Sequence, residues 1–191
     1  MIKSGQTPAV SRKPGHQRAD SLTDKAYSAL EEMIVTLQLE PGEVLSEVAL
    51  SLELGIGRTP IREALQRLAR EGLVTILPRK GILVSDINPR KQLLLLEVRR
   101  VLERLIARSA AQRATSQERA AFRTIAEGIE KASAERDDLS FMRYDDELNK
   151  LMALAAHNEY ANRAIGLMHG LSRRFWYMHY KETADLPLTA G

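Results

Sequence analysis

The apolar residues of the first 71 positions recur every three or four residues in three separate stretches, which is the spacing of one buried helix face. The first stretch ends in the turn Pro41-Gly42, and the third covers 58–71. A serine or threonine that precedes a helix accepts hydrogen bonds from its free amides, so we expect Ser46 to cap the second helix and Thr59 the third. The pattern therefore predicts three short helices in succession.

A different pattern follows these helices. Residues 73–77 and 82–84 are short apolar runs on either side of the basic turn Pro78-Arg79-Lys80-Gly81, which is typical of a β-hairpin. Helical spacing then returns and contains no strand pattern, so a bundle of four helices is expected over 91–114, 116–135, 139–157 and 160–180. The fold class is predicted to be mainly α, a winged helix-turn-helix (three helices plus a β-hairpin wing) followed by an all-helical bundle.

The distribution of charged and apolar residues divides the chain into three regions. Residues 1–19 carry four bases, no acid and no apolar period, which predicts a flexible basic arm. Residues 20–87 are expected to form the winged helix-turn-helix, and 88–191 the helical domain.

Charge is concentrated in one short segment. The formal net charge is only +3, but residues 56–80 carry six bases against two acids, whereas residues 20–55 carry one base against eight acids. Arg58, Arg62 and Gln66 stand at four-residue spacing opposite the apolar stripe of the third helix. An α-helix fits the DNA major groove, where arginine can bind guanine, although an ordinary surface helix would show the same row. The basic hairpin beside the helix favours DNA.

These residues resemble the DNA-binding domain of the GntR family. The resemblance rests on LGIGRTPIREALQRL at 54–68, EGLV at 71–74 and the wing tip Arg79-Lys80-Gly81. It implies that Arg58 and Arg62 read bases, that Thr59 and nearby backbone amides hold phosphates, and that the wing tip lies in or along the minor groove. Some members carry another arginine on the second helix, and no contact is expected there because this chain has Val48.

The second region resembles the FCD effector domain of the FadR-like branch of that family, in EVRRVLE at 97–103, YDDELN at 144–149 and His157-Asn158. Such domains hold a divalent metal and bind a small carboxylate beside it. Asp145 and Asn149 stand at the first two metal positions, but asparagine replaces the usual histidine and is a weak ligand for zinc or nickel. The later histidine ligands would lie beyond residue 191, so we expect the domain to be incomplete at its C-terminal end. We therefore expect weak metal binding or none.

Arg99 is the predicted effector-binding residue, because its family position points into the effector cavity. An ion pair with Glu103, four residues on, explains Arg99 equally well. His169 and His179 are expected to be packed or solvated rather than metal ligands. The aromatic run Phe175-Trp176-Tyr177 is assigned to core or dimer packing.

Several other functions are disfavoured. The chain has no cysteine for a disulfide or a thiolate metal site, and no apolar run approaches the ~18 residues of a membrane span. No glycine-rich phosphate loop, serine-nucleophile motif or HExxH is present, so an enzyme is not expected.

We therefore predict a cytoplasmic, sequence-specific transcriptional regulator that acts as a repressor and responds to an organic acid. A homodimer on an inverted-repeat operator is expected, because one recognition helix reads too few base pairs for genomic specificity. The alternative is a winged-helix protein that contacts protein or RNA, with a degenerate effector domain.

Overall fold

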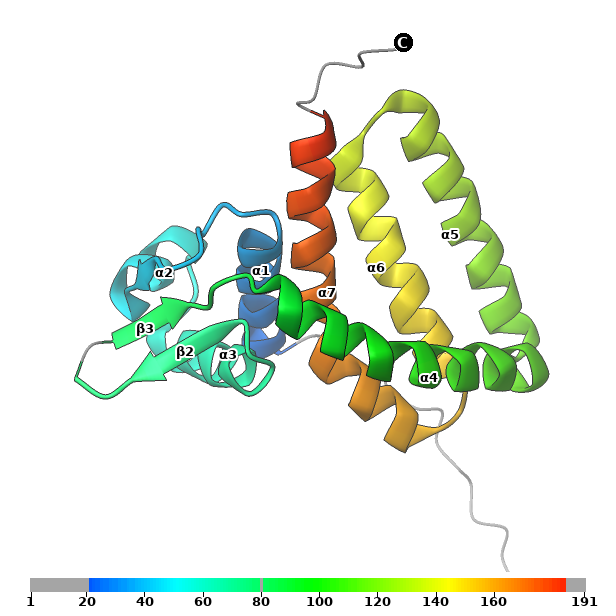
Figure 1. Cartoon of the computed structure of the whole chain (residues 1–191), viewed down its shortest axis with the longest axis horizontal. Helices are drawn as coiled ribbons and strands as arrows, with labels where there is room; N and C mark the ends of the chain where they lie inside the picture. The colour runs from blue at the N-terminus through cyan, green and yellow to red at the C-terminus, as the bar shows by residue number, and fades with distance from the viewer. Residues whose placement is uncertain (1–20, 80, 185–191) are drawn as a thin grey trace, which may run out of the picture.

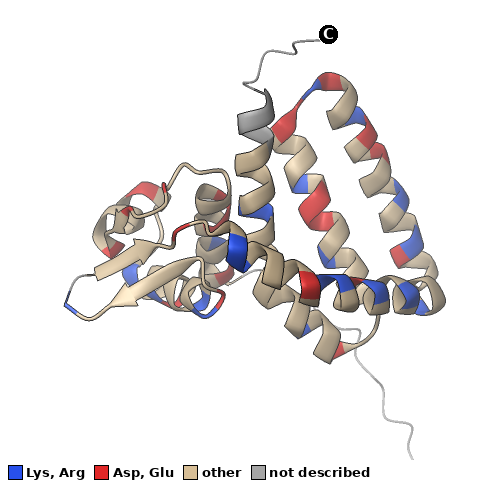
Figure 2. Ribbon diagram, viewed as in Figure 1, with Lys and Arg blue, Asp and Glu red and all other residues tan. Residues whose placement is uncertain are grey.

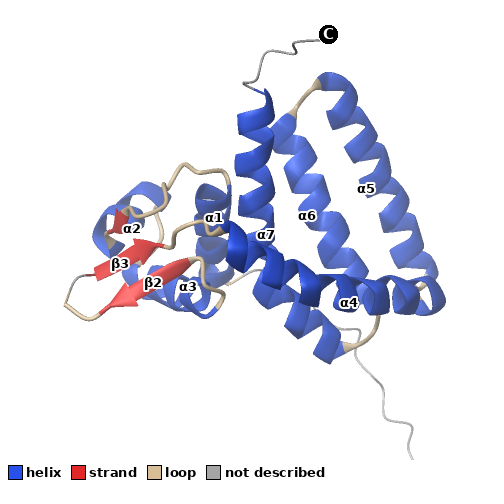
Figure 3. Cartoon of the chain, viewed as in Figure 1, coloured by secondary structure: helices blue, strands red, loops and turns tan. Residues whose placement is uncertain are grey.

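A computed structural model describes residues 21–79 and 81–184 of the chain (Figure 1). The predicted basic arm, residues 1–19, and the wing residue Lys80 lie outside the described residues. The structure has an N-terminal part of short helices and strands and a C-terminal part made of long helices, and the described strands all belong to the first part (Figure 3). The mainly α fold class, with a winged helix-turn-helix and a helical bundle, is confirmed.

The three predicted N-terminal helices are α1 (Leu22–Val35), α2 (Glu47–Leu54) and α3 (Arg58–Arg70). The Ser46 hydroxyl accepts the amide hydrogen of Ala49 at the start of α2, as predicted. The prediction for Thr59 is wrong, because α3 begins at Arg58 and its N-cap is Gly57, which has no side chain. Thr59 already has helical backbone and lies exposed in the first turn, where its hydroxyl cannot serve as the cap.

The hairpin is formed by β2 (Val74–Leu77) and β3 (Gly81–Val84), which pair antiparallel. A third strand, β1 (Val44–Leu45), pairs with the other edge of β3 and gives the order β1-β3-β2. The sequence did not reveal β1, since two residues are too few to show an alternating pattern. The sheet closes one side of a core whose largest fully buried members are Leu30, Ile34, Ile61, Leu65, Leu68, Leu73, Val74 and Val84.

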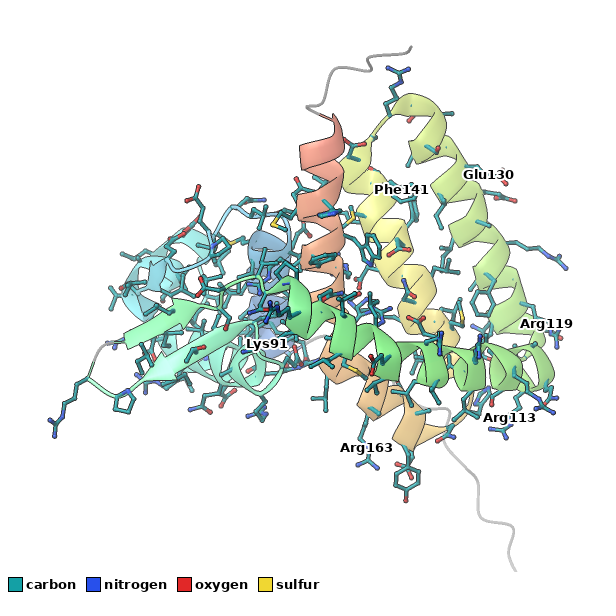
Figure 4. All side chains as sticks on the ribbon, viewed as in Figure 1. Lys91, Arg113, Arg119, Glu130, Phe141 and Arg163 are labelled. Atoms are coloured by element: carbon teal, nitrogen blue, oxygen red, sulfur yellow. The ribbon has the colours of Figure 1, made fainter. Side chains whose placement is uncertain are left out.

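The bundle consists of α4 (Pro89–Arg113), α5 (Ser116–Glu135), α6 (Asp138–Ala155) and α7 (Glu159–Ala184). Helix α5 lies along α6, and α4 packs against both α6 and α7 (Figure 1). Arg113 and Arg119 lie at the corner where α4 leads into α5 (Figure 4). Arg113 donates to the backbone oxygen of Ala156 at 2.9 Å, which ties this corner to the end of α6.

The apolar residues of α4 fall on two faces of the helix. Ile106 is buried and Leu102 packs partly against the bundle core. In contrast, Leu94, Val98 and Leu105 are 63%, 51% and 46% exposed. Helix α4 therefore has one apolar face toward the bundle and a second one toward solvent.

Helix α7 joins the two parts of the molecule, because it packs against α1 as well as α4 (Figure 1). The buried guanidinium of Arg174 donates to the backbone oxygens of Ser85, at 2.7 Å, and Asp86, at 3.3 Å. These two residues follow β3 and lead into α4. The connection between the sheet and the bundle is therefore held by a side chain of α7.

Candidate nucleic-acid interface and ligand cavity

Helix α3 presents the predicted polar row on its exposed side. The side chains of Arg58 and Arg62 are 60% and 54% exposed, and Gln66 is exposed one turn further along. Ile61, Leu65 and Leu68 are buried on the opposite side. Basic residues occur both on α3 and beside the turn of the hairpin (Figure 2). The helix thus has the division into a packed and a polar face that insertion into a groove requires.

Glu47, at the start of α2, holds both arginines of this row. Its carboxylate accepts from Arg62 Nε at 3.0 Å and from Arg62 Nη2 at 2.7 Å, and it lies 3.9 Å from Arg58 Nη2. The hydrogen bond from Arg62 lowers the pKa of Glu47. The sequence analysis missed this residue, although an acid in the first turn of the helix before the recognition helix was a visible signal.

The turn between the helices sets this geometry. Gly55 adopts a left-handed conformation with φ of 62° and ends α2, so that α3 can begin only three residues later. Left-handed backbone is readily adopted by glycine and rarely by other residues. The short turn is what brings Glu47 opposite Arg62.

At the wing, two of the three predicted residues are described. Arg79 is exposed with φ of 63°, and Gly81 begins β3 with φ of 97°. Arg79 thus stands at the end of the hairpin, which extends away from the bundle (Figure 1). Arg79 is therefore accessible to another molecule, and it belongs to the same winged-helix part as α3.

A second candidate site is a cavity of about 340 Å³ between α4, α6 and α7. Three of its lining residues are the predicted Arg99, Asp145 and Asn149, which the fold brings together from two helices. Its other lining residues are Phe141, Met142, His169, Arg173 and Trp176. Arg99 also pairs with Glu103, with Nε 2.9 Å from Oε1, so the ion-pair interpretation is confirmed, and effector binding by Arg99 stays a prediction.

The cavity wall is strongly charged. Burial raises the pKa of Asp145, and the nearby His169 and Arg173 act in the opposite direction. Burial also disfavours the charged form of Asp146, yet hydrogen bonds from His169 and Lys150 and the charge of Arg173 hold its pKa at about 2. His169 is 9% exposed and its Nε2 lies 2.8 Å from Asp146 Oδ1, so it is packed and paired. The sequence analysis missed Arg173, whose place in the cavity depends on how α7 packs.

Two family models match the chain over most of its length. Residues 22–84 match the model of bacterial regulatory proteins of the gntR family, and residues 94–190 match the FCD domain. The chain belongs to the GntR family, with an FCD domain. Both domains of the predicted architecture are therefore present in one chain.

Relatives and solved structures agree with this assignment. The chain is 42% identical over 91 residues to the Nta operon transcriptional regulator of Aminobacter aminovorans, across 48% of this chain and 43% of that one. It is 28% identical over 162 residues to the transcriptional repressor RspR of Escherichia coli, across 83% and 70%. For four of the curated relatives that it matches, the chain spans only between 27% and 62% of the relative's own length. The structure of E. coli McbR/YncC superposes with a TM-score of 0.71 at 23% identity, over 89% of this chain and 79% of that one, and shares the fold.

The metal site that the FCD family suggests does not fit the residues of this chain. The Asn149 amide nitrogen donates to the backbone oxygen of Asp145 at 2.8 Å and to its carboxylate at 3.2 Å, so a donor rather than an oxygen ligand faces Asp145. His169 is bonded to Asp146 instead of Asp145. Within residues 21–79 and 81–184, no group of three or more histidine, aspartate or glutamate side chains forms a candidate metal site. A zinc or nickel site of the family's type lacks its donors here.

No helix of the described residues is both long and apolar enough to cross a bilayer.

Proposed function

We propose that this GntR-family chain is a cytoplasmic repressor that binds an inverted-repeat operator as a homodimer and releases it in response to a small organic acid. The observation that carries the proposal is the exposed row Arg58, Arg62 and Gln66 on a helix whose other face is packed. The name of the E. coli relative, a transcriptional repressor, supports the direction of regulation.

On DNA, Arg62 would release the carboxylate of Glu47 and donate its hydrogen bonds to the edge of a base instead. Both are hydrogen-bond acceptors that an arginine can meet with two parallel donors. The exposed pair with Glu47 is screened by water and contributes little to stability, so replacing it costs little. Arg58 and Gln66 would contact neighbouring bases, while Thr59, Arg79, Lys80 and the Gly81 backbone would meet the sugar-phosphate backbone.

The effector would occupy the cavity between α4, α6 and α7. Arg99 and Arg173 supply two guanidinium groups and His169 an imidazole, against the single carboxylate of Asp145 among the lining residues. Guanidinium groups bind carboxylates with two hydrogen bonds, which favours a small organic acid as the ligand. The volume of about 340 Å³ suits a molecule of a few carbon atoms.

The homodimer is supported by the second apolar face of α4. Leu94, Val98, Val101 and Leu105 are between 46% and 65% exposed. Their spacing of four, three and four residues is that of a helix-pairing seam. A second copy of the same helix offers a complementary seam about a two-fold axis, which matches the symmetry of an inverted repeat.

The experiment begins with selection of the preferred duplex from random DNA, followed by titration of that duplex and a scrambled one at several salt concentrations. Arg62→Ala should cost roughly 1–3 kcal/mol on the selected duplex and relax base preference. Arg79→Ala, at the wing, should weaken both duplexes similarly and flatten the salt dependence by about one unit. If the wild-type protein does not distinguish the two duplexes, or binds RNA more tightly, the operator proposal is wrong.

A further inference from the structure

A buried ion cluster connects the ligand cavity with the winged-helix part. Its largely buried members are Glu31 from α1, Asp146 from α6, and His169 and Arg173 from α7, and the exposed Lys150 of α6 pairs with Asp146 at the edge of the cluster. The side chains of Glu31 and Arg173 are only 5% and 8% exposed, so their charges face little solvent. Charges buried in this way are strongly dependent on one another, because water does not compensate for a lost partner.

Arg173 is shared between the two parts of the molecule. Its Nη1 lies 3.4 Å from Glu31 Oε1 and also 3.4 Å from Asp146 Oδ1. Its Nε is buried and has no acceptor among the described residues. A guanidinium can form two short parallel hydrogen bonds with one carboxylate. Arg173 forms no such bidentate pair with Glu31 or with Asp146. Its binding capacity is therefore only partly used, and it lines the cavity where a further anion would bind.

The position of Glu31 also couples the bundle to the recognition helix α3. It lies on α1, which packs along α3. On the same helix the Tyr27 hydroxyl donates to Glu71, at the end of α3, at 2.7 Å. A movement of α1 relative to the bundle therefore carries α3 with it.

Helix α7 also packs very closely against the winged-helix part at Gly170. A Cβ atom at Gly170 would lie 2.6 Å from Leu73 Cδ1 and 3.1 Å from Glu31 Oε1. Packed surfaces this close change by discrete shifts rather than by gradual deformation.

We propose that Arg173 is a switch residue, which an anion in the cavity draws away from Glu31 so that α1 loses its buried attachment to α7. This inference rests on the proposed function only in taking the effector to be an anion in that cavity. A ligand changes a conformational equilibrium only if it interacts differently with the two states. Arg173 meets this condition because Glu31 and the ligand compete for the same guanidinium.

Glu32 provides a matched control. It is the next residue of α1 and also pairs with the bundle, since its Oε1 lies 2.6 Å from Arg143 Nη2. That pair is exposed, at 34% and 56%, and Arg143 does not line the cavity. The two glutamates thus differ in burial and in connection to the cavity, while each links α1 to the bundle.

The first test needs no ligand. Asp146→Asn removes the carboxylate that competes for Arg173, so Glu31 should hold it more firmly and hydrogen exchange of the α1 amides should slow by about fivefold. Exchange rates report local opening of this kind. In a Glu31→Gln background Asp146→Asn should leave α1 exchange unchanged, whereas in a Glu32→Gln background the slowing should persist. The same response in all three backgrounds would overturn the inference.

The second test uses acetate, succinate and citrate at matched ionic strength, with the fluorescence of Trp176 as the signal. Trp176 is the only tryptophan of the chain and lines the cavity. Glu31→Gln should raise the affinity for a bound anion about tenfold, because Arg173 no longer has to leave a carboxylate, and Glu32→Gln should change it less than twofold. An anion that binds equally to all three proteins would refute the switch and leave the effector proposal intact. If no anion changes the fluorescence of any of them, the effector proposal loses its support, and the exchange experiment decides the switch by itself.

Discussion

At the scale of single residues, the proposed DNA-binding face is already ordered in the absence of DNA. Glu47 takes both donors on one side of the Arg62 guanidinium and stands near Arg58. A side chain that is already ordered loses less conformational entropy on binding. The same carboxylate places a negative charge on a face that must approach phosphates, which disfavours non-specific binding.

Replacing Glu47 should therefore affect specificity more than affinity. Glu47→Gln is expected to raise affinity for a scrambled duplex by about two- to threefold at low salt, through the lost negative charge, and to lower the preference for the selected duplex about tenfold. The measurement is the ratio of the two dissociation constants. Glu53→Gln, an exposed acid on the same helix, removes the same charge and should preserve the ratio. Equal effects of the two changes would mean that Glu47 acts through charge alone.

The side chains around Asp145 also predict how strongly the protein binds zinc and nickel. Asp145 faces an amide donor of Asn149, and His169 is engaged by Asp146, so zinc and nickel should bind weakly or not at all. Calorimetric titration of metal-stripped protein should show no stoichiometric micromolar site, and Asn149→His should help little by adding a single imidazole. A tight site that disappears with Asp145→Ala would show that the ligands have been assigned wrongly.

At the scale of elements, helix α7 contains two glycines in contrasting surroundings. A Cβ at Gly166 would meet nothing within 4 Å, whereas at Gly170 it would collide with Leu73 and Glu31. Alanine is favoured over glycine inside a helix by roughly 1 kcal/mol. Crowding in a packed interface costs roughly 1–3 kcal/mol.

The two alanine substitutions should therefore act in opposite directions. Gly166→Ala is expected to raise the free energy of unfolding by up to about 1 kcal/mol, and Gly170→Ala to lower it by about 1–3 kcal/mol. Urea unfolding followed by circular dichroism measures both. Equal stability of Gly170→Ala and Gly166→Ala would contradict the close approach of α7 to Leu73 and Glu31.

At the scale of the whole molecule, the outer face of α4 leaves several large apolar side chains exposed to solvent. Val101, at its centre, is 65% exposed. A charged residue there would be buried in a two-fold seam, which is strongly unfavourable without a partner.

Val101→Glu should therefore convert the proposed dimer to a monomer and weaken binding to the selected duplex at least tenfold, because two half-sites are no longer bound together. Leu154→Glu is the control, since Leu154 is similarly exposed, at 57%, but lies on α6 outside the seam. Sedimentation at micromolar concentration decides the outcome. A wild-type protein that sediments as a monomer and still binds the selected duplex without assembling would contradict the dimer.

Much of the architecture could be predicted from the sequence because it depends on local spacing. The apolar stripe of Ile61, Leu65 and Leu68 identified α3 and placed Arg58 and Arg62 on its exposed side, as the structure shows. Ser46 and Gly55 marked the two ends of α2 through cap and turn preferences that involve only neighbouring residues. The hairpin and its basic turn were visible for the same reason.

Only the tertiary structure decided how distant residues pair and which faces remain open. Arg173 and Glu31 are 142 positions apart, and their contact depends on the packing of α7 against α1, which no local pattern encodes. Helix α4 is apolar on two sides, and hydrophobic spacing could not show that one packs in the bundle while Leu94 and Val101 stay exposed. Local periodicity determines what each element is, because it acts through neighbouring backbone and side chains. Packing determines partners and exposed surfaces, because burial and charge compensation are properties of the assembled chain.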